Sequence, residues 1–165
     1  EIVFGDWSSD VCSSDLALRM QVHTSKTEAA AVPSNQKVKI DLLSIKSTTA
    51  PACIAASAMD GKKLKDSGRI LIFYITAEER EGSIIAPDGT VKKLGQDYML
   101  RSGKFEITLK LNSNRKYKLY PLSMNGIRRN ELPITCTPDG TVLIAVDTEK
   151  LHHGATPFFE LVDEL

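Results

Sequence analysis

The sequence has little that would serve chemistry or attract a strongly charged partner. Lysine plus arginine equals aspartate plus glutamate, at 21 each, so no summed field draws in phosphate backbones or anionic lipid. We therefore expect no nucleic acid and no membrane surface as a partner. The longest apolar run, Ile70 to Ile75, falls far short of the roughly 20 residues that span a bilayer, so we expect no transmembrane helix.

Export and redox signals are also sparse. The N-terminus lacks a basic segment followed by an apolar stretch and a small-residue cleavage site, so it predicts no signal peptide. Any export signal of a secreted or periplasmic parent would lie upstream, and the compartment stays open. The three cysteines, Cys12, Cys53 and Cys136, are too few and too scattered for a zinc site or a disulfide framework. They are expected to be buried free thiols, with a Cys53–Cys136 bridge as the alternative.

No run of residues has the spacing of a known reactive site. Gly-x-Ser-x-Gly, His-Glu-x-x-His and Gly-x-x-x-x-Gly-Lys patterns do not occur. His152 and His153 are adjacent, and neighbours in an extended segment point to opposite sides, so a turn is favoured over a metal site. Glu78, Glu79 and Glu81 are interpreted as a solvated loop tip. The sequence predicts no catalytic residue, no metal ligand and no cofactor.

The first sixteen residues differ from the rest in pattern. The eleven residues Asp6 to Leu16 show neither period 2 nor period 3.6. They resemble, residue for residue, the in-frame translation of a widely used short-read sequencing adapter. We therefore expect residues 1–16 to be a non-native coil joined to a truncated reading frame, and we set the only tryptophan, Trp7, and Cys12 aside. A natural Ser/Asp-rich linker is the alternative, and resequencing the source DNA across codon 16 would distinguish the two.

From Arg19 onward, short alternating segments are separated by turn dipeptides, the pattern of a sandwich or barrel. The predicted strands are 19–24, 37–45, 52–58, 69–75, 82–86, 90–94, 104–111, 116–122, 131–136, 141–147 and 157–162.

The clearest strand runs from Lys104 to Leu111, where every second residue is apolar, so one face covers a core. Glu106 lies on its outward face, where cross-strand ion pairing is the ordinary role. Ile70 to Ile75 is apolar on both faces, so we place it centrally, with one face on the core and the other against a neighbour, which need not belong to this chain. Residues 141–147 suggest a half-buried strand, and Pro121 marks a strand end or an edge.

Turn chemistry supports hairpins. Four dipeptides offer the positive φ that tight turns require: Asp60-Gly61, Asp88-Gly89, Asn125-Gly126 and Asp139-Gly140. Helical signals are weak: residues 76–79 are expected to be a loop because Gly82 follows, residues 25–31 carry only some helical propensity, and residues 29–36 are interpreted as a connection. The sequence thus predicts an all-β protein, an antiparallel β-sandwich built of hairpins over residues 17–165, after a disordered N-terminal segment.

The order of segments from 17 to 165 resembles a known domain. The segment Ala56 to Leu71 is similar to an "S-L-D-G-K-P-L-x-x-S-x-R-L-L" signature, and four further segments match in order: 22–28, 100–107, 117–122 and 159–161. Together they resemble the C-terminal β-domain of bacterial proteins similar to glycoside hydrolases with a TIM-barrel catalytic domain. After Ile75-Thr76 such sequences often carry an Asn-Thr-Gly-like turn, whereas this chain has Glu79-Arg80-Glu81-Gly82, so the resemblance assigns no role to that loop.

The resemblance implies an accessory role rather than catalysis. Glycoside hydrolysis usually uses two carboxylates, and in the families resembled here the barrel supplies them, so no acid is carried over. Our first hypothesis is a structural β-sandwich whose partner is the missing barrel of the same chain, which predicts an exposed apolar patch. The second is a carbohydrate-binding module with polysaccharide as partner, and the third is an unrecognised stand-alone enzyme. The parent's substrate, linkage and activity stay open.

Sugar binding needs flat exposed aromatic rings. Phe105, Phe73 and Phe158 are expected in the core. The tyrosines that remain for the surface, Tyr98, Tyr117 and Tyr120, are too scattered to form a good platform.

Overall fold

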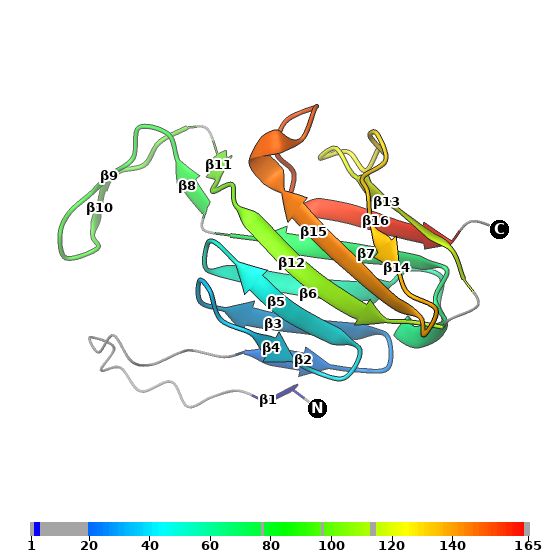
Figure 1. Cartoon of the computed structure of the whole chain (residues 1–165). Coiled ribbons are helices and arrows are strands. Elements are labelled where there is room, and N and C mark those ends of the chain that lie inside the picture. Colours follow the sequence, from blue (N-terminus) through cyan, green and yellow to red (C-terminus); the bar gives the residue numbers. More distant parts are fainter. Residues whose placement is uncertain (1, 4–19, 77, 97, 113–114, 164–165) are drawn as a thin grey trace.

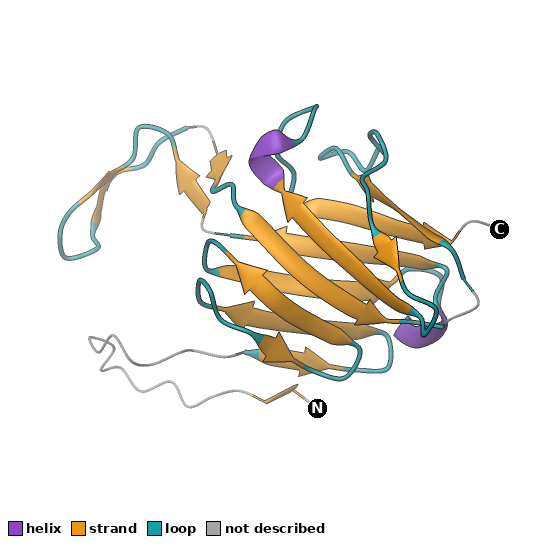
Figure 2. Cartoon of the chain, viewed as in Figure 1, coloured by secondary structure: helices purple, strands orange, loops and turns teal. Residues whose placement is uncertain are grey.

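The structure is a computed structural model that describes residues 2–3, 20–76, 78–96, 98–112 and 115–163. Two antiparallel sheets face each other as a β-sandwich (Figure 1), so the predicted all-β class is confirmed. In the described residues, helix is limited to two single 3₁₀ turns, η1 (Leu64–Asp66) and η2 (Thr148–Lys150) (Figure 2). Within the described part of the chain, no helix has the length and apolar character needed to cross a membrane.

The larger sheet has seven strands. Their spatial order is β1 (Ile2–Val3), β2 (Gln21–His23), β3 (Thr27–Val32), β6 (Ala52–Ala58), β7 (Arg69–Ile75), β16 (Phe158–Asp163) and β13 (Tyr117–Pro121). The expected coil at residues 1–16 thus includes a short strand, and the rest of that segment lies outside the described residues. Pro121 ends the edge strand β13, as predicted.

The smaller sheet has five strands and lies in front of the larger one in Figure 1. Their order is β14 (Thr135–Cys136), β15 (Thr141–Asp147), β12 (Lys104–Lys110), β5 (Leu43–Thr48) and β4 (Val38–Lys39). The four predicted Asp-Gly and Asn-Gly turns all place glycine at φ of +80° to +83°, in the left-handed region that a side chain disfavours.

The core fills the space between the sheets with side chains from alternate strand positions. Phe105 is 2% exposed, stacks on Tyr74 with ring centroids 4.6 Å apart, and meets Phe159 edge-on at 5.5 Å. The other large, fully buried side chains around them are aliphatic: Leu43, Ile45, Ile54, Leu64, Ile70, Ile72, Ile107, Leu109, Leu111 and Leu119. Burial alternates along β12 and β15 as their sequence periodicity predicted.

A ribbon-like arm projects from this body between β7 and β12 (Figure 1). Near the body, β8 (Glu78–Arg80) pairs with β11 (Tyr98–Leu100), and toward the tip β9 (Ile84–Ile85) pairs with β10 (Val91–Lys93). The predicted hairpin around Asp88-Gly89 is therefore present. The expected loop at residues 76–79 is wrong in part, because Glu78 and Glu79 belong to β8.

Two other strand predictions are also corrected. The single strand expected over 37–45 is instead the hairpin β4–β5, with Asp41 and Leu42 in its turn. Residues 27–32, read as weakly helical and then as a connection, form the strand β3 between β2 and β6. Tertiary pairing with two neighbours overrides the local preference of an alanine-rich segment.

Candidate docking surfaces

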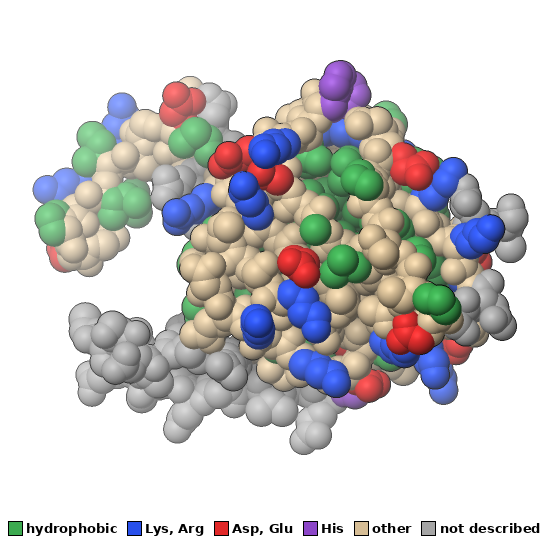
Figure 3. Space-filling view, viewed as in Figure 1, with side chains coloured by type: hydrophobic (Ala, Val, Ile, Leu, Met, Phe, Trp, Pro, Cys, Tyr) green, Lys and Arg blue, Asp and Glu red, His purple; other side chains and the backbone are tan. Residues whose placement is uncertain are grey.

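The arm carries a concentration of exposed apolar side chains (Figure 3). Across its outer pair, Val91 lies opposite Ile85, and the two are 53% and 60% exposed. Six of the eleven exposed large hydrophobic residues of the described chain lie in this segment: Ile84, Ile85, Val91, Leu94, Met99 and Leu100. A narrow two-stranded ribbon has no second layer to cover such residues, so they are available to a partner.

The middle of the arm, between its two strand pairs, is tightly packed. The backbone N–H of Gly95 donates to the Ser83 hydroxyl at 2.9 Å, and a Cβ on Gly95 would lie 2.0 Å from the Glu81 carbonyl oxygen. Only glycine allows this close approach between the two sides of the arm. The arm is therefore a paired ribbon along its length.

The second candidate surface is the outer face of the seven-stranded sheet, the side turned away from the five-stranded sheet. One cross-strand row on this face consists of Ala29, Ala55, Phe73 and Phe158 in direct register. We call the part of this outer face formed by β3, β6, β7 and β16 the apolar face. Phe73 meets Phe158 edge-to-face at 5.7 Å, and both rings are half-buried.

A second row of the apolar face continues toward the base of the arm. It aligns Ala31, Cys53 and Ile75, of which Ile75 is 42% exposed. A shallow open groove lies over this row, bordered by Pro33 and Pro51. The expectation that Ile70 to Ile75 meets the core with one face is confirmed, and the other face has no covering layer among the described residues.

An arginine pair borders the apolar face. The Glu160 side chain, 4% exposed, accepts hydrogen bonds from Nε of Arg69 and Nε of Arg128. Burial alone would raise the pKa of Glu160, but the hydrogen bonds from Arg128 and Arg69 outweigh it and hold the pKa below its ordinary value. The arginine side chains are 58% and 49% exposed, and Arg128 also lies over the Tyr120 ring at 5.4 Å. Two cations against one anion leave this border net positive.

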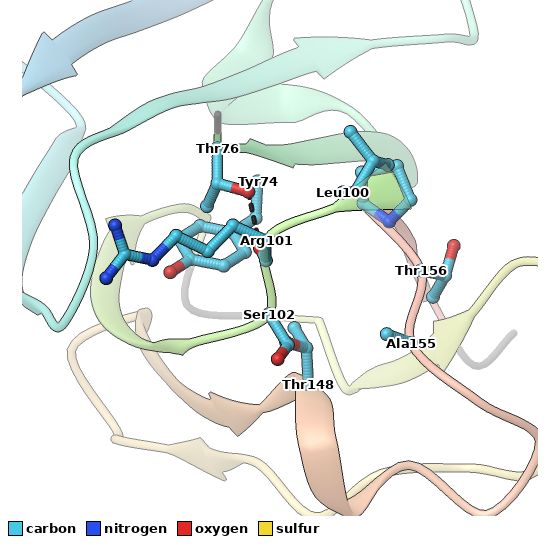
Figure 4. A pocket seen from close by; sticks show the side chains of 9 residues that line it. Tyr74, Thr76, Leu100, Arg101, Ser102, Thr148, Ala155 and Thr156 are labelled. Atoms are coloured by element: carbon cyan, nitrogen blue, oxygen red, sulfur yellow. Dashed lines mark hydrogen bonds between the residues drawn. The ribbon is translucent and has the colours of Figure 1, made fainter. Parts of the chain in front are cut away.

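A small hollow lies where the arm meets the body (Figure 4). Its volume is about 40 Å³, and its lining includes Tyr74, Thr76, Arg101 and Thr148. Pockets for small-molecule ligands usually measure roughly 300–1,000 Å³, so this hollow holds a few water molecules at most. It offers no room for a sugar ring.

The signature segment 56–71 closes one end of the sandwich. Asp60 accepts hydrogen bonds from the Ser67 hydroxyl at 2.8 Å and the Gly68 N–H at 2.8 Å, while Leu64, in η1, is 1% exposed. Tyr117 donates its hydroxyl to the Ser67 carbonyl at 2.8 Å. Burial would raise the pKa of Asp60, but the hydrogen bonds outweigh it and lower the pKa. These side chains make their contacts within the domain itself.

The acidic and histidine residues weighed from sequence do not converge. His152 and His153 are exposed and contact each other at 4.5 Å between ring centroids, and no metal-ligating group in the described part of the chain includes them. Glu106 lies opposite Ala145 and Ser47 rather than opposite lysines. The lysines of its strand pair elsewhere, Lys104 with Asp147 and Lys110 with Asp139. The expected ion pairing of Glu106 is therefore wrong.

The cysteines and aromatic rings also need correction. Cys53 and Cys136 are both free, on different sheets. Cys53 is half-buried on the apolar face, where burial raises the pKa of its thiol, and Cys136 is exposed, so the expected burial is wrong for Cys136. Cys12 lies outside the described residues.

Phe105 is in the core, as expected, but Phe73 and Phe158 lie on the outer face instead. Tyr117 is 6% exposed and belongs to the core, whereas Tyr120 is partly covered by Arg128. The side chain of Tyr98 lies outside the described residues. A tyrosine platform for sugar is therefore not formed by Tyr117 and Tyr120.

Sequence reasoning missed one cluster entirely. His23, Glu28 and Asp41 bring ligand-type atoms within 4.8 Å of one another. Their separations in sequence match no metal motif, and only the pairing of β2 with β3 and the nearby β4–β5 turn bring them together.

Comparison with known proteins gave no match to a family model, to a curated protein or to a solved structure.

Proposed function

We propose that this chain is a non-catalytic accessory β-sandwich that docks on the barrel domain of a glycoside hydrolase-like parent. The observation that carries the proposal is the outer face of β7, where Leu71, Phe73 and Ile75 have no covering layer among the described residues. Side chains of this kind on both faces of a strand are typical of a strand buried on both sides. A barrel with an apolar surface would supply the missing layer.

The arm supports the same role. It projects from the end of the sandwich at which Ile75 borders the groove, so a partner on the apolar face lies beside the base of the arm. Exposed contiguous apolar surface of this kind marks interaction sites. The arm would clasp the partner while the sheet face forms the flat part of the interface.

Charge favours a partner domain over a second copy. The Arg69–Glu160–Arg128 border is net positive, so the partner surface is expected to carry carboxylates next to its apolar area. A two-fold pairing of identical chains would bring the same cationic border on both sides. We therefore commit to the barrel as the occupant.

The test compares the isolated domain, carrying Cys12→Ser, with the longer natural protein by maleimide labelling of individual cysteines. Cys53 lies on the apolar face and Cys136 lies on the other sheet, so Cys136 is an internal control. We expect Cys53 to label at least several-fold more slowly in the longer protein, with Cys136 unchanged. An unchanged Cys53 rate would refute docking at this face.

Two further measurements separate the alternatives. Reading the natural coding sequence upstream of residue 17 should reveal a barrel with paired acids, and any other upstream domain would overturn the glycoside hydrolase part. Pull-down on insoluble polysaccharides should show no retention of the isolated domain. Retention would favour a carbohydrate-binding module, and a stable dimer in light scattering would assign the face to a second copy.

A further inference from the structure

We propose a divalent cation site of the zinc class formed by His23, Glu28 and Asp41, which goes beyond the docking role. The three residues come from three segments: the end of β2, the start of β3 and the turn between β4 and β5. They lie where one side of the seven-stranded sheet meets the five-stranded sheet (Figure 1). A bound ion would therefore join the two layers.

Glu28 is the anchor of the site. It is 1% exposed, and its carboxylate accepts backbone N–H bonds from Leu42 at 3.1 and 3.0 Å and from Leu43 at 2.7 Å. Metal-ligating carboxylates are commonly held in this way by hydrogen bonds from a second layer. These bonds also fix the β4–β5 turn, which carries Asp41, beside the carboxylate.

The geometry of the donor atoms fits one ion. His23 Nε2 lies 3.5 Å from Glu28 Oε1 and 4.0 Å from Asp41 Oδ2, and all three atoms lie within 4.8 Å of one another. Tetrahedral zinc with ligands at about 2.0–2.1 Å places its ligand atoms about 3.4 Å apart. The side chains of His23 and Asp41 are 57% and 69% exposed, so they can close the remaining distance.

The local turn holds the histidine in register. The Thr24 hydroxyl accepts the N–H of Thr27 at 2.9 Å, which closes the hairpin and places His23 directly opposite Glu28. Both side chains then project from the same side of the sheet. The imidazole presents Nε2 to the two carboxylates.

The negative charge of the cluster favours a bound cation. Among the described residues, the ion pairs of Glu28 include no lysine or arginine, only the histidine. Buried charges are normally paired or coordinate a metal. The carboxylates of Glu28 and Asp41 bring two negative charges to one place, and a divalent cation bound between them and the imidazole would balance these charges. One imidazole with two carboxylate oxygens is a donor set that zinc accepts, with a fourth position left for water.

The test uses the imidazole signals of the whole chain, because it has only three histidines. In tag-free protein, ZnCl₂ should shift the Nε2 signal of His23 with 1:1 saturation, while His152 and His153 serve as internal controls. Asp41→Asn should weaken the apparent affinity at least about tenfold. Asp66→Asn, an exposed aspartate elsewhere, should leave it unchanged. The thermal midpoint should rise with zinc in the natural chain and return with EDTA, and at the same zinc concentration it should rise less in Asp41→Asn.

Three results would overturn the site. A His23 signal that responds to pH and not to zinc would leave a proton as the only cation there. Zinc-induced shifts confined to His152 and His153 would place the ion elsewhere. Zinc binding by Asp41→Asn as tight as that of the natural chain would remove Asp41 from the site.

Discussion

Two phenylalanines on neighbouring layers provide a sharp test of which surface is core and which is left for a partner. Phe105→Ala removes a ring that is 2% exposed and packed between Tyr74 and Phe159. Truncation of a fully buried phenylalanine costs about 3–5 kcal/mol, since a cavity remains. Phe73→Ala removes a half-buried ring whose one aromatic partner among the described residues is Phe158. Lost burial and one aromatic pair amount to about 1–2 kcal/mol.

The assay is urea unfolding of the isolated domain followed by circular dichroism. With an unchanged slope, the difference in midpoint reports the difference in free energy of unfolding. The free energy of unfolding of such a domain is roughly 5–15 kcal/mol in total, so Phe105→Ala could prevent folding. Phe105→Leu, which should cost about 1–2 kcal/mol, serves as the milder variant in that case. The urea midpoint of Phe105→Ala is therefore expected to lie far below that of Phe73→Ala, and the midpoint of Phe73→Ala should lie close to that of the natural chain.

Equal losses of unfolding free energy in Phe105→Ala and Phe73→Ala would refute this reasoning. Such a result would mean that the outer face of β7 is covered within the chain itself, and the proposed docking surface would be lost with it. In the longer protein, by contrast, Phe73→Ala should cost more than in the isolated domain, because truncation there opens a cavity in an interface.

Three further predictions concern contacts inside the domain. Gly103→Ala should lower the free energy of unfolding by about 1–3 kcal/mol, because its Cβ would lie 2.5 Å from the Tyr74 hydroxyl; thermal denaturation measures this, and a neutral effect would contradict the packing. Glu160→Gln should destabilise the protein above about pH 5, and the difference from the natural chain should shrink as the pH falls below the ordinary value of 4.5, because a lowered folded pKa stabilises only the ionised state; a gap independent of pH in urea titrations would argue against it. Asp60→Ala should cost about 1–2 kcal/mol, since the Ser67 hydroxyl and two backbone N–H groups lose their acceptor, and faster hydrogen exchange at Gly68 should accompany the loss.

Strands with a strict period were predictable from sequence. β6, β7 and β15 begin and end at the predicted residues, because their alternation or continuous apolar run is bounded by turn residues. β3 was not predictable in this way. Its alanines carry little periodic signal, and only pairing with β2 and β6 identifies it as a strand. The turn at Asp41 was missed because Ile40 and Leu42 continue an apolar pattern without glycine or proline.

The candidate sites show a similar division. The presence of the hairpin at Asp88-Gly89 follows from its turn, but its projection away from the body depends on what the faces pack against, which period alone does not encode. The His23–Glu28–Asp41 cluster depends on strand register and on the meeting of two sheets. The projection of the arm and the His23–Glu28–Asp41 cluster therefore cannot be found from residue spacing along the chain.

β7 is the element in which the sequence already pointed beyond this domain. Its inner residues Ile70, Ile72 and Tyr74 are at most 3% exposed and complete the sandwich core, so folding alone needs only that face. Polar residues at Leu71, Phe73 and Ile75 would serve a free domain better, because an apolar outer face invites aggregation. Three large apolar side chains on this outer face, beside an apolar arm and a cationic border, are what the proposed docking against a second layer predicts.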